Sequence, residues 1–565
     1  MRLSIPISVL GLTLAVSIMA QEKPVPGQRA AGITPPDSIV RTVPQENATK
    51  STQGLPKFDI PEYVITGAVS FDLPDVSKQE AAEPAHILEL ADPTASTRDR
   101  STFNFVTEQK SSLTSNPTRI GYGRLQGSSG TYLTSHLGLR IGAFGPTSFF
   151  GADADYRSAK AYVPFTNRSG GDVRFRGELA LTSPGNWFDR GTLGGEIGYG
   201  SETYRFYGYR NPALTRAITR FALSAHYGSP RELLFSHEAN IGLALKTIKD
   251  SSSSVTETRF GLGAAVNLPV GTFPLNARID FGLASITGAS SKTLPFVDAQ
   301  FFSEKVWYGD FSVQGALHGY LAQGMLSQKF ARLYPHVSLG YRFVQNTVLA
   351  LSYAGRVHQN TLSALTAAHP YVSANATVRQ SDVPIDVMAS FETDWTPVWR
   401  TRLSARLQSV RDFPLLTEGG LKGIWATDYQ GTTRIGTYQA DLFAKFDANS
   451  YFTLSLEIND SKNTSTQRKV PYLPEARLSG SAWFEVARGL SICPSLSYVG
   501  NRVPDLLVAD KLGGYVCANL RAEYIVLEFL EVGVDFRNFT NTRYEEWSGY
   551  QAVPATITAG LTCRW

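Results

Sequence analysis

The feature of this chain that most constrains its fold is a strict alternation of apolar and charged residues over long segments. In "VRFRGELAL", residues 173–181, Val173 and Phe175 fall on one face of an extended segment, while Arg174 and Arg176 fall on the other. A period of two is typical of a β-strand with one apolar and one polar face. The pattern therefore predicts strands rather than helices.

The same alternation recurs at residues 277–283, 402–408 and 532–537. Soluble β-sandwiches also alternate, but their strands are usually about 5–6 residues long. Here many segments run for about ten residues or more, the length that crosses a bilayer at a tilt. In a membrane barrel the apolar face points outward to lipid and the polar face points into the lumen, and closure leaves no unpaired edge in the hydrocarbon. The chain is therefore predicted to be a transmembrane β-barrel.

Short turns between apolar segments set the expected number of strands. Ten occur, near residues 145, 187, 229, 270, 308, 344, 396, 448, 488 and 527. Each interval between them fits one long hairpin, and polar segments such as "TNRSGGD" lie in between. Ten turns at one end and eleven longer loops at the other predict about 22 strands, an even number as in other such barrels. The predicted fold class is all-β: a transmembrane antiparallel β-barrel of about 22 strands with a disordered N-terminal tail.

The N-terminal residues have the features of an export signal. Arg2 precedes an apolar run from Leu3 to Ile18, and Ala20 is a small residue suited to cleavage. A membrane anchor is the alternative, but the run is short for a spanning helix and Pro6 interrupts it. We therefore expect residues 1–20 to be a signal peptide and the mature protein to be exported. The net charge of +4 is small for this length and gives no reason to expect nucleic acid as a partner.

The C-terminal strand carries an assembly signature. In "ATITAGLTCRW", Ala559, Leu561, Cys563 and Trp565 share the apolar face, and Trp565 is the terminal residue. A terminal aromatic residue on an amphipathic last strand resembles the signal by which outer-membrane barrels are recognised for assembly. We therefore expect the barrel-assembly machinery and outer-membrane lipids as partners, in a Gram-negative-type bacterium, with the N-terminal tail in the periplasm.

Two stretches carry a resemblance to a known family. From Leu520 the chain reads "LRAEYIVLEFLEVGVDFRNFTNTRYEEWSGYQAVPATITAGLTCRW", which resembles the closing strands of TonB-dependent receptors. A middle stretch, residues 333–392, is similar to the barrel of that family, with strand, turn, strand, a loop containing "HPYV", and a new strand. The resemblance spans roughly residues 118–565, the predicted barrel. It implies a receptor that takes part in solute uptake across the outer membrane.

An apolar, β-branched island, "FDIPEYVITGAVSFDLP", interrupts the polar N-terminal tail. Val, Ile and Thr favour an extended backbone, and strand addition to a partner works through main-chain hydrogen bonds. We expect a Pro-rich disordered linker at residues 21–57 and a docking segment at residues 58–78, bound by TonB or another periplasmic protein. The alternative is that the island packs against the rim of the barrel. Within the island, a short segment resembles the TonB box, by which the family docks on TonB: Glu62, Tyr63, Val64, Ile65, Thr66 and Gly67.

The chain departs from the family ahead of the barrel. TonB-dependent receptors have a globular plug domain between the box and the barrel, whereas residues 79–117 are polar and too few for such a domain. We expect these residues to be a short tether or a remnant of the plug. Energised transport is then an open question, because the element that TonB would pull on is largely missing.

Charged residues on the polar faces of the strands form the candidate site in the lumen. Opposite charges on neighbouring strands can pair and stiffen the wall. The functional alternative is a polar path for a solute, or a surface for a partner protein that fills the lumen. The residues are Arg140, Asp153, Asp155, Arg174, Arg176, Glu178, Arg278, Asp280, Arg402, Arg406, Arg521, Asp535 and Arg537.

Cys493 and Cys517 lie on the polar faces of two strands that are expected to be neighbours in a hairpin. If the connecting loop centres near residue 505, the two residues face each other. A disulfide is then one alternative in an exported protein, and two free thiols are the other.

No motif of catalysis stands out. The eight His residues show no metal-binding spacing, and neither "GxSxG" nor a phosphate loop occurs. We therefore expect no enzymatic activity, no cofactor and no metal site. The preferred function is uptake of an unspecified solute through the outer membrane. The alternatives are a structural barrel filled by a partner protein and a passive porin plugged by its own tail.

Overall fold

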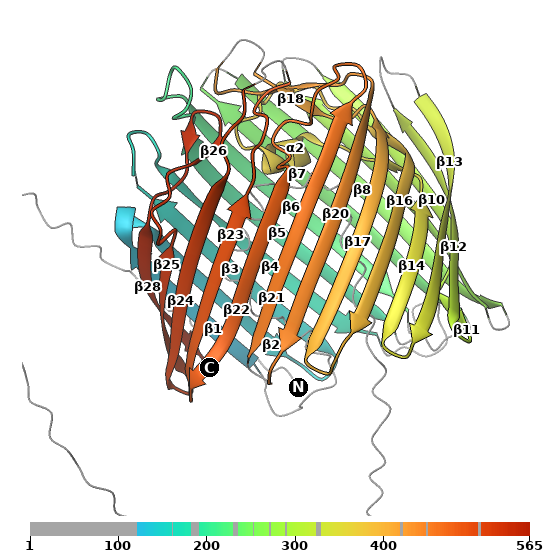
Figure 1. The fold of residues 1–565 in the computed structure, drawn as a ribbon, viewed down its shortest axis with the longest axis horizontal. Coiled ribbons are helices and arrows are strands. Elements are labelled where there is room, and N and C mark those ends of the chain that lie inside the picture. The colour runs from blue at the N-terminus through green and yellow to red at the C-terminus, as the bar shows by residue number, and fades with distance from the viewer. Residues whose placement is uncertain are drawn as a thin grey trace, which may run out of the picture. The chain divides into compact units, whose positions relative to one another are not determined.

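The computed structural model describes residues 121–565, apart from residues 161, 182–190, 230–234, 252, 271–272, 289–290, 324–328, 419–421, 448–449 and 507–509. The predicted signal peptide, linker, docking segment and tether, residues 1–117, lie outside the described residues. Twenty-two long antiparallel strands close into a barrel (Figure 1), which confirms the predicted fold class and strand number. Among the described residues, no helix has the length and apolar character that crossing a bilayer requires.

The first eleven wall strands are β1 (Gly121–Gly130), β2 (Ser135–Phe144), β3 (Ser148–Ala159), β4 (Arg168–Ala180), β5 (Thr192–Arg205), β6 (Thr215–Gly228), β7 (Ser236–Asp250), β8 (Ser253–Val270), β9 (Phe273–Thr287), β10 (Lys292–Ser303) and β12 (Phe311–Gln323). The other eleven are β13 (Lys329–Val344), β14 (Thr347–Ala354), β16 (Ser381–Asp394), β17 (Trp399–Arg411), β20 (Thr432–Lys445), β21 (Tyr451–Asn463), β22 (Ala476–Ala487), β23 (Leu490–Val499), β24 (Tyr515–Leu527), β25 (Leu530–Arg537) and β28 (Thr556–Arg564).

Short elements lie in the connections or extend a wall strand. They are η1 (Thr131–Leu133), β11 (Val306–Tyr308), β15 (Arg356–His358), α2 (Leu362–Ala368), the pair β18 (Leu415–Thr417) and β19 (Ala426–Asp428), and the pair β26 (Glu545–Trp547) and β27 (Tyr550–Gln551). Figure 1 shows α2 and β18 toward the same end of the barrel.

The strand register separates the two faces of the wall as the alternation predicted. Phe175 lies opposite Ala152 on β3 and Ile197 on β5. Phe175 and Ile197 are 54% and 43% exposed on the outer face. The next residue along β4, Arg174, lies opposite Asp153 on the inner face. The apolar band is therefore outside, which is the inversion that a bilayer requires.

All ten predicted short turns fall between consecutive strands, at one end of the barrel that we call the short-turn end. The opposite end, the long-loop end, carries long connections after β15, β17, β21, β23 and β25. The prediction of longer loops throughout this end is wrong for the first half of the chain. After β7, for example, only residues 251 and 252 intervene before β8.

The barrel closes between its first and last strands. Strand β1 pairs with both β2 and β28. At this seam the Gly123 N–H donates to the Trp565 carbonyl at 2.8 Å, and the Trp565 N–H donates to the Gly123 carbonyl at 3.0 Å. A Cβ atom on Gly123 would lie 2.0 Å from the indole ring, so glycine leaves the room that the ring occupies. Trp565 is 64% exposed, so the residue predicted as the assembly signal lies on the outer face of the seam.

Candidate functional site

Ion pairs hold eleven of the thirteen predicted lumen charges. Some pairs cross between neighbouring strands, as expected: Arg140 with Asp153 at 2.6 Å, Arg174 with Glu196 at 3.3 Å, Arg176 with Asp153 at 3.4 Å, and Arg406 with Asp386 at 2.6 Å. Asp155 also pairs across strands with His136 of β2, and along its own strand with Arg157. The remaining pairs form along one strand: Arg278 with Asp280, Arg521 with Glu523, and Arg537 with Asp535. Within the described part of the chain, Glu178 and Arg402 form no ion pair.

Most of these pairs are partly exposed. Exposed ion pairs contribute about 0–1 kcal/mol each, so together they favour a stiff, polar wall rather than any single binding point. The pairing supports the structural alternative for these residues. A candidate site has to be sought where side chains of the wall meet something other than the wall.

Such a place lies at the long-loop end, where five connections form what we call the cap. The cap comprises the described residues of these connections: 359–380, 412–418, 422–431, 464–475, 500–506, 510–514 and 538–555. Its centre is aromatic and buried: Trp425, Trp547 and Tyr550 are at most 2% exposed. Tyr371 stacks on Tyr550 with ring centroids 3.5 Å apart. Loops with such a packed centre are a folded part of the protein rather than a flexible fringe.

The first of these connections, residues 359–380, is the element that the wall holds, and we call it the strap. Its helix α2 begins with Thr361 as N-cap, whose hydroxyl accepts from the Ala364 N–H at 3.0 Å. Two further N–H groups, of Leu362 and Ser363, donate to the carboxylate of Glu257 at 2.7 and 2.9 Å. Glu257 is a wall residue of β8 and is 1% exposed. A carboxylate from the wall therefore satisfies the free N–H groups of this helix end.

Arg216 of β6 makes the strongest attachment to the strap. Its guanidinium forms two bonds with Asp250, at 2.7 and 2.8 Å, and donates to the carbonyls of Pro370 and Val372 at 2.8 and 2.7 Å. The Arg216 side chain is fully buried. It also lies over the ring of Phe206, 4.7 Å from the centroid. One side chain of the wall thus fixes the strap backbone at two nearby carbonyls through charge-assisted bonds.

Three more wall residues attach the strap along its length. Lys246 of β7 donates to the Thr366 hydroxyl at 2.7 Å, and Lys292 of β10 donates to the Val378 carbonyl at 2.7 Å. The Tyr204 hydroxyl of β5 donates to the Pro370 carbonyl at 2.7 Å. The five anchors therefore come from β5, β6, β7, β8 and β10, and together they bind the strap from Leu362 in α2 to Val378.

Apolar contacts complete the attachment. At the long-loop end the inner face of β6 to β10 changes from charged to apolar, at Ile218, Ile248, Val255, Ala284 and Leu294, all buried. These side chains belong to one cluster with strap residues that include Leu362, Leu365, Tyr371 and Val372. Full burial of a Leu or Ile side chain stabilises by about 1.5–3 kcal/mol. The strap is thus packed against the inner face of the wall at this end of the barrel.

His369 lies at the centre of the aromatic packing. Its ring centroid is 3.6 Å from that of Trp547 and 4.5 Å from that of Trp425, and its side chain is 1% exposed. Its Nδ1 accepts from the Tyr371 N–H at 3.2 Å, which places the proton of the neutral ring on Nε2. Burial lowers the pKa of His369 well below its usual range, and the positive charge of Arg216 adds to the effect. The folded cap therefore holds this imidazole neutral.

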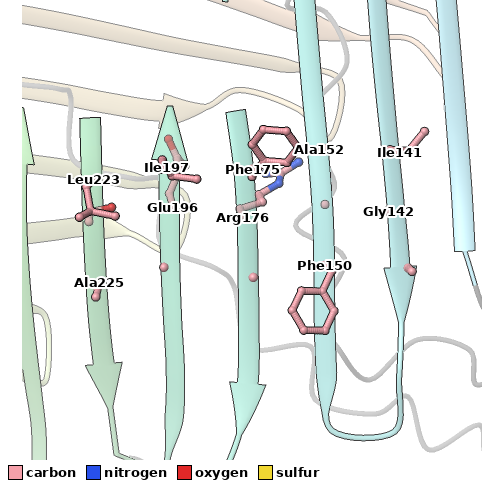
Figure 2. Close-up of a pocket in the computed structure, with 15 residues that line it drawn as sticks. Ile141, Gly142, Phe150, Ala152, Phe175, Arg176, Glu196, Ile197, Leu223 and Ala225 are labelled. Carbon is pink, nitrogen blue, oxygen red and sulfur yellow. The ribbon is translucent and has the colours of Figure 1, made fainter. Parts of the chain in front are cut away.

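A hollow of about 730 Å³ lies on the outer face of β2 to β6 (Figure 2). The register places small residues in one row across β4 to β6, at Gly177, Gly195 and Ala225, beside a row of larger ones that includes Phe175 and Ile197. Sites for polar solutes need placed polar groups among their apolar lining. This hollow belongs to the apolar outer band, so it is not a candidate for a polar solute.

Of the two alternatives for Cys493 and Cys517, the structure has the two free thiols and not the disulfide. Cys493 lies opposite Arg521, and Cys517 lies opposite Ser497, so the two cysteines are four residues out of register. Four residues correspond to about 13 Å along a strand, whereas a disulfide needs Cα atoms within roughly 7 Å. The loop between β23 and β24 centres two residues later than expected. A shift of the loop centre by one residue changes the residue that lies opposite a given position by two, which gives the difference of four.

None of the strap anchors was singled out from the sequence. The "HPYV" loop was noted only for its place in the strand order, yet His369 and Tyr371 form the centre of the cap. One signal was present: Ile248, Val255 and Leu294 occupy positions on the polar face of their strands but are apolar. An apolar residue facing a wet lumen is out of place unless another element covers it.

The titration of His369 predicts that acid loosens the cap. Because the folded cap lowers the pKa of this group, its stabilising contribution is complete above pH about 6.5 and is lost as the pH falls below that value. The population of the opened cap should rise by up to about tenfold for each pH unit below 6.5. The measurement is the rate of maleimide labelling at Leu365→Cys, with the three native cysteines replaced by serine, divided at each pH by the rate for free glutathione, because the reactive thiolate becomes scarcer in acid. In the matched variant His369→Phe this ratio should not change between pH 7.5 and 5, and an equal acid response of the ratio in both proteins would contradict the assignment.

Comparison with solved structures places this barrel among known folds. The FrpB iron transporter from Neisseria meningitidis (F3-3 variant) superposes with a TM-score of 0.65 at 10% identity, covering 79% of this chain and 82% of that one. The copper transporter OprC gives 0.61 at 13% identity, with 79% and 80% covered. The siderophore receptor PiuA from Acinetobacter baumannii gives 0.63 at 9% identity, with 79% and 82% covered.

No protein-family model and no curated protein matches the sequence. The three structural neighbours are TonB-dependent receptors, the family that the two sequence stretches resembled. At this level of identity the likeness concerns the fold. The chain has the 22-stranded barrel of the TonB-dependent receptors.

Proposed function

We propose that the protein is an outer-membrane transport barrel whose passage is gated by the strap. The barrel fold and its apolar outer band support a place in the outer membrane. The neighbours named above are transporters and a receptor, for iron, copper and siderophores. We carry over transport as a class and leave the solute open.

The observation that carries the proposal is the set of buried anchors on the strap. Arg216 and Glu257 are at most 1% exposed, and each uses its charge to hold strap backbone. Burial of charged groups is costly unless they are paired and hydrogen-bonded. A passive porin has no need of such an attachment, because its function is an open lumen. Two discrete states, strap in and strap out, are what a gate requires.

The first experiment measures conductance through the full-length protein in planar bilayers. The wild type should conduct little, because the strap fills the long-loop end. Arg216→Met should raise the conductance at least severalfold, because it removes the bonds to Pro370 and Val372 and leaves Asp250 without its partner. Breaking such a buried pair costs about 3–5 kcal/mol. The matched control is Arg220→Met, four residues further along the same face of β6, where the arginine pairs with Glu202 at 3.0 Å and is 53% exposed.

Two further outcomes decide between the alternatives. A wild type that conducts as strongly as Arg216→Met would favour a passive porin. If neither Arg216→Met nor the milder Glu257→Gln conducts, although both assemble as heat-modifiable barrels, the strap is not the gate and a structural barrel filled by a partner becomes the better account.

We also propose that residues 62–67 dock on TonB or on another periplasmic protein by strand addition. The support is the resemblance of this segment to a TonB box and its β-branched composition. A signal peptide at residues 1–20 and a periplasmic location of the tail belong to the same proposal. With only residues 79–117 between the segment and the barrel, the pull would act on a short tether rather than on a full plug.

The docking proposal is tested by retention of the purified periplasmic domain of TonB on the full-length protein. Ile65→Pro removes a main-chain donor from the segment and should reduce retention at least tenfold, without changing the heat-modifiable migration of the barrel. Ile39→Pro, in the predicted linker, is the matched control and should retain the wild-type amount. Equal retention by both variants would contradict the docking role.

A further inference from the structure

A cavity of about 360 Å³ lies between the cap and the inner wall near the closure seam. Its wall side comes from β1, β2, β3, β23, β24, β25 and β28, and its cap side comes from the strap and from residues 538–555. The volume is within the range of sites for small molecules, roughly 300–1,000 Å³. None of the five wall anchors of the strap lines this cavity, so its lining calls for a separate explanation.

Six aromatic rings line the cavity, and the contacts fix several of them in place. The hydroxyls of Tyr162 and Tyr207 both donate to the Gln551 carbonyl, each at 2.8 Å. Tyr544 stacks on Tyr515 with ring centroids 3.7 Å apart. Rings held in this way present ready-made flat surfaces, which lowers the ordering cost of binding. The six are Tyr162, Tyr207, Tyr371, Tyr544, Trp547 and Tyr550.

The charges around the cavity compensate one another. Arg157 pairs with Asp155 at 2.8 Å, and Arg537 pairs with Asp535 at 2.7 Å. Glu546 lines the cavity, and Arg502 donates to its carbonyl at 3.2 Å. Both arginines of the lining are thus already engaged by aspartates, whereas the Arg502 bond goes to the main chain of Glu546. An anionic ligand would therefore have to compete with these aspartates to offset its own desolvation.

The other polar groups of the lining are small hydroxyls and amides. Ser128, Ser497, Asn519 and Thr558 come from the wall, and Asn538 comes from the cap. Asn519 is held by the Asn538 N–H at 2.8 Å and by Ser495 at 3.2 Å. Neutral donors and acceptors of this kind match ligand hydroxyls, and aromatic faces match the C–H faces of a saturated ring.

From these features we infer that the cavity binds a neutral carbohydrate, one or two sugar rings stacked on the aromatic side chains with their hydroxyls toward the wall. The inference rests on the proposed function, for which it supplies the class of solute. Because Tyr371 and Tyr550 belong both to the cavity and to the packed centre of the cap, a bound sugar would contact the strap itself. A ligand that prefers one position of the strap shifts the equilibrium of the gate.

The test uses the full-length protein in a detergent without a sugar headgroup. A printed array of oligosaccharides, with neutral, amino and acidic members, identifies the best binder, and calorimetry then measures its affinity. We expect a neutral oligosaccharide to bind at least tenfold more tightly than its acidic counterpart of the same backbone. Ser128→Phe, which fills the cavity from β1, should weaken binding at least tenfold. Gln126→Leu, two residues away on the same face and outside the cavity, should leave it unchanged.

Three outcomes would overturn the inference: no binding to any member of the array, tighter binding of acidic or amino sugars, or equal loss in Ser128→Phe and Gln126→Leu. Conductance keeps this failure distinct from failure of the gate. If Arg216→Met raises conductance while no neutral sugar binds, the ligand class is wrong and the gate stands. If Arg216→Met has no effect, the proposed function fails whatever the array shows.

Discussion

The constraint on which this structure depends is the pairing of every main-chain polar group in a wall that faces hydrocarbon. An open sheet edge cannot be tolerated there, so the first and last strands must meet. The seam between β1 and β28 satisfies this need, down to the reciprocal bonds between Gly123 and Trp565. Closure then fixes the rest: one face of each strand points to lipid, the other points inward, and all irregular backbone is confined to the two ends.

Confinement of the loops to the ends explains where a specific site can form. The short-turn end has only short connections between its strands. The long-loop end carries five connections of the second half of the barrel, and they fold over the lumen rather than out into water. The strap is held there by charged side chains that are buried only because it covers them. Such an attachment is strong while complete and weakens sharply once one partner is lost, which is the behaviour expected of a gate rather than of a permanent wall.

Much of the fold could be predicted from the sequence, because the period-two pattern and the ten turns are local signals. The strand faces, the strand number and the position of Trp565 follow from them. The strap could not be predicted in this way, since its contacts join Arg216, Glu257 and Lys292 to residues 154, 105 and 86 positions further along the chain. The disulfide alternative fails for a related reason: register depends on the centre of a loop, and an error of two residues separated Cys493 from Cys517 by four.

The central claim is that the strap is a folded part of the closed barrel, and hydrogen–deuterium exchange of the full-length protein in nanodiscs tests it most directly. The peptide that covers residues 359–380 contains the main-chain groups of α2 together with His369 and Tyr371. The account predicts that its amides exchange nearly as slowly as those of β16, and that they lose this protection in Arg216→Met while β16 keeps it. Exchange of the wild-type strap at the rate of the turn at residues 345–346 would contradict the account.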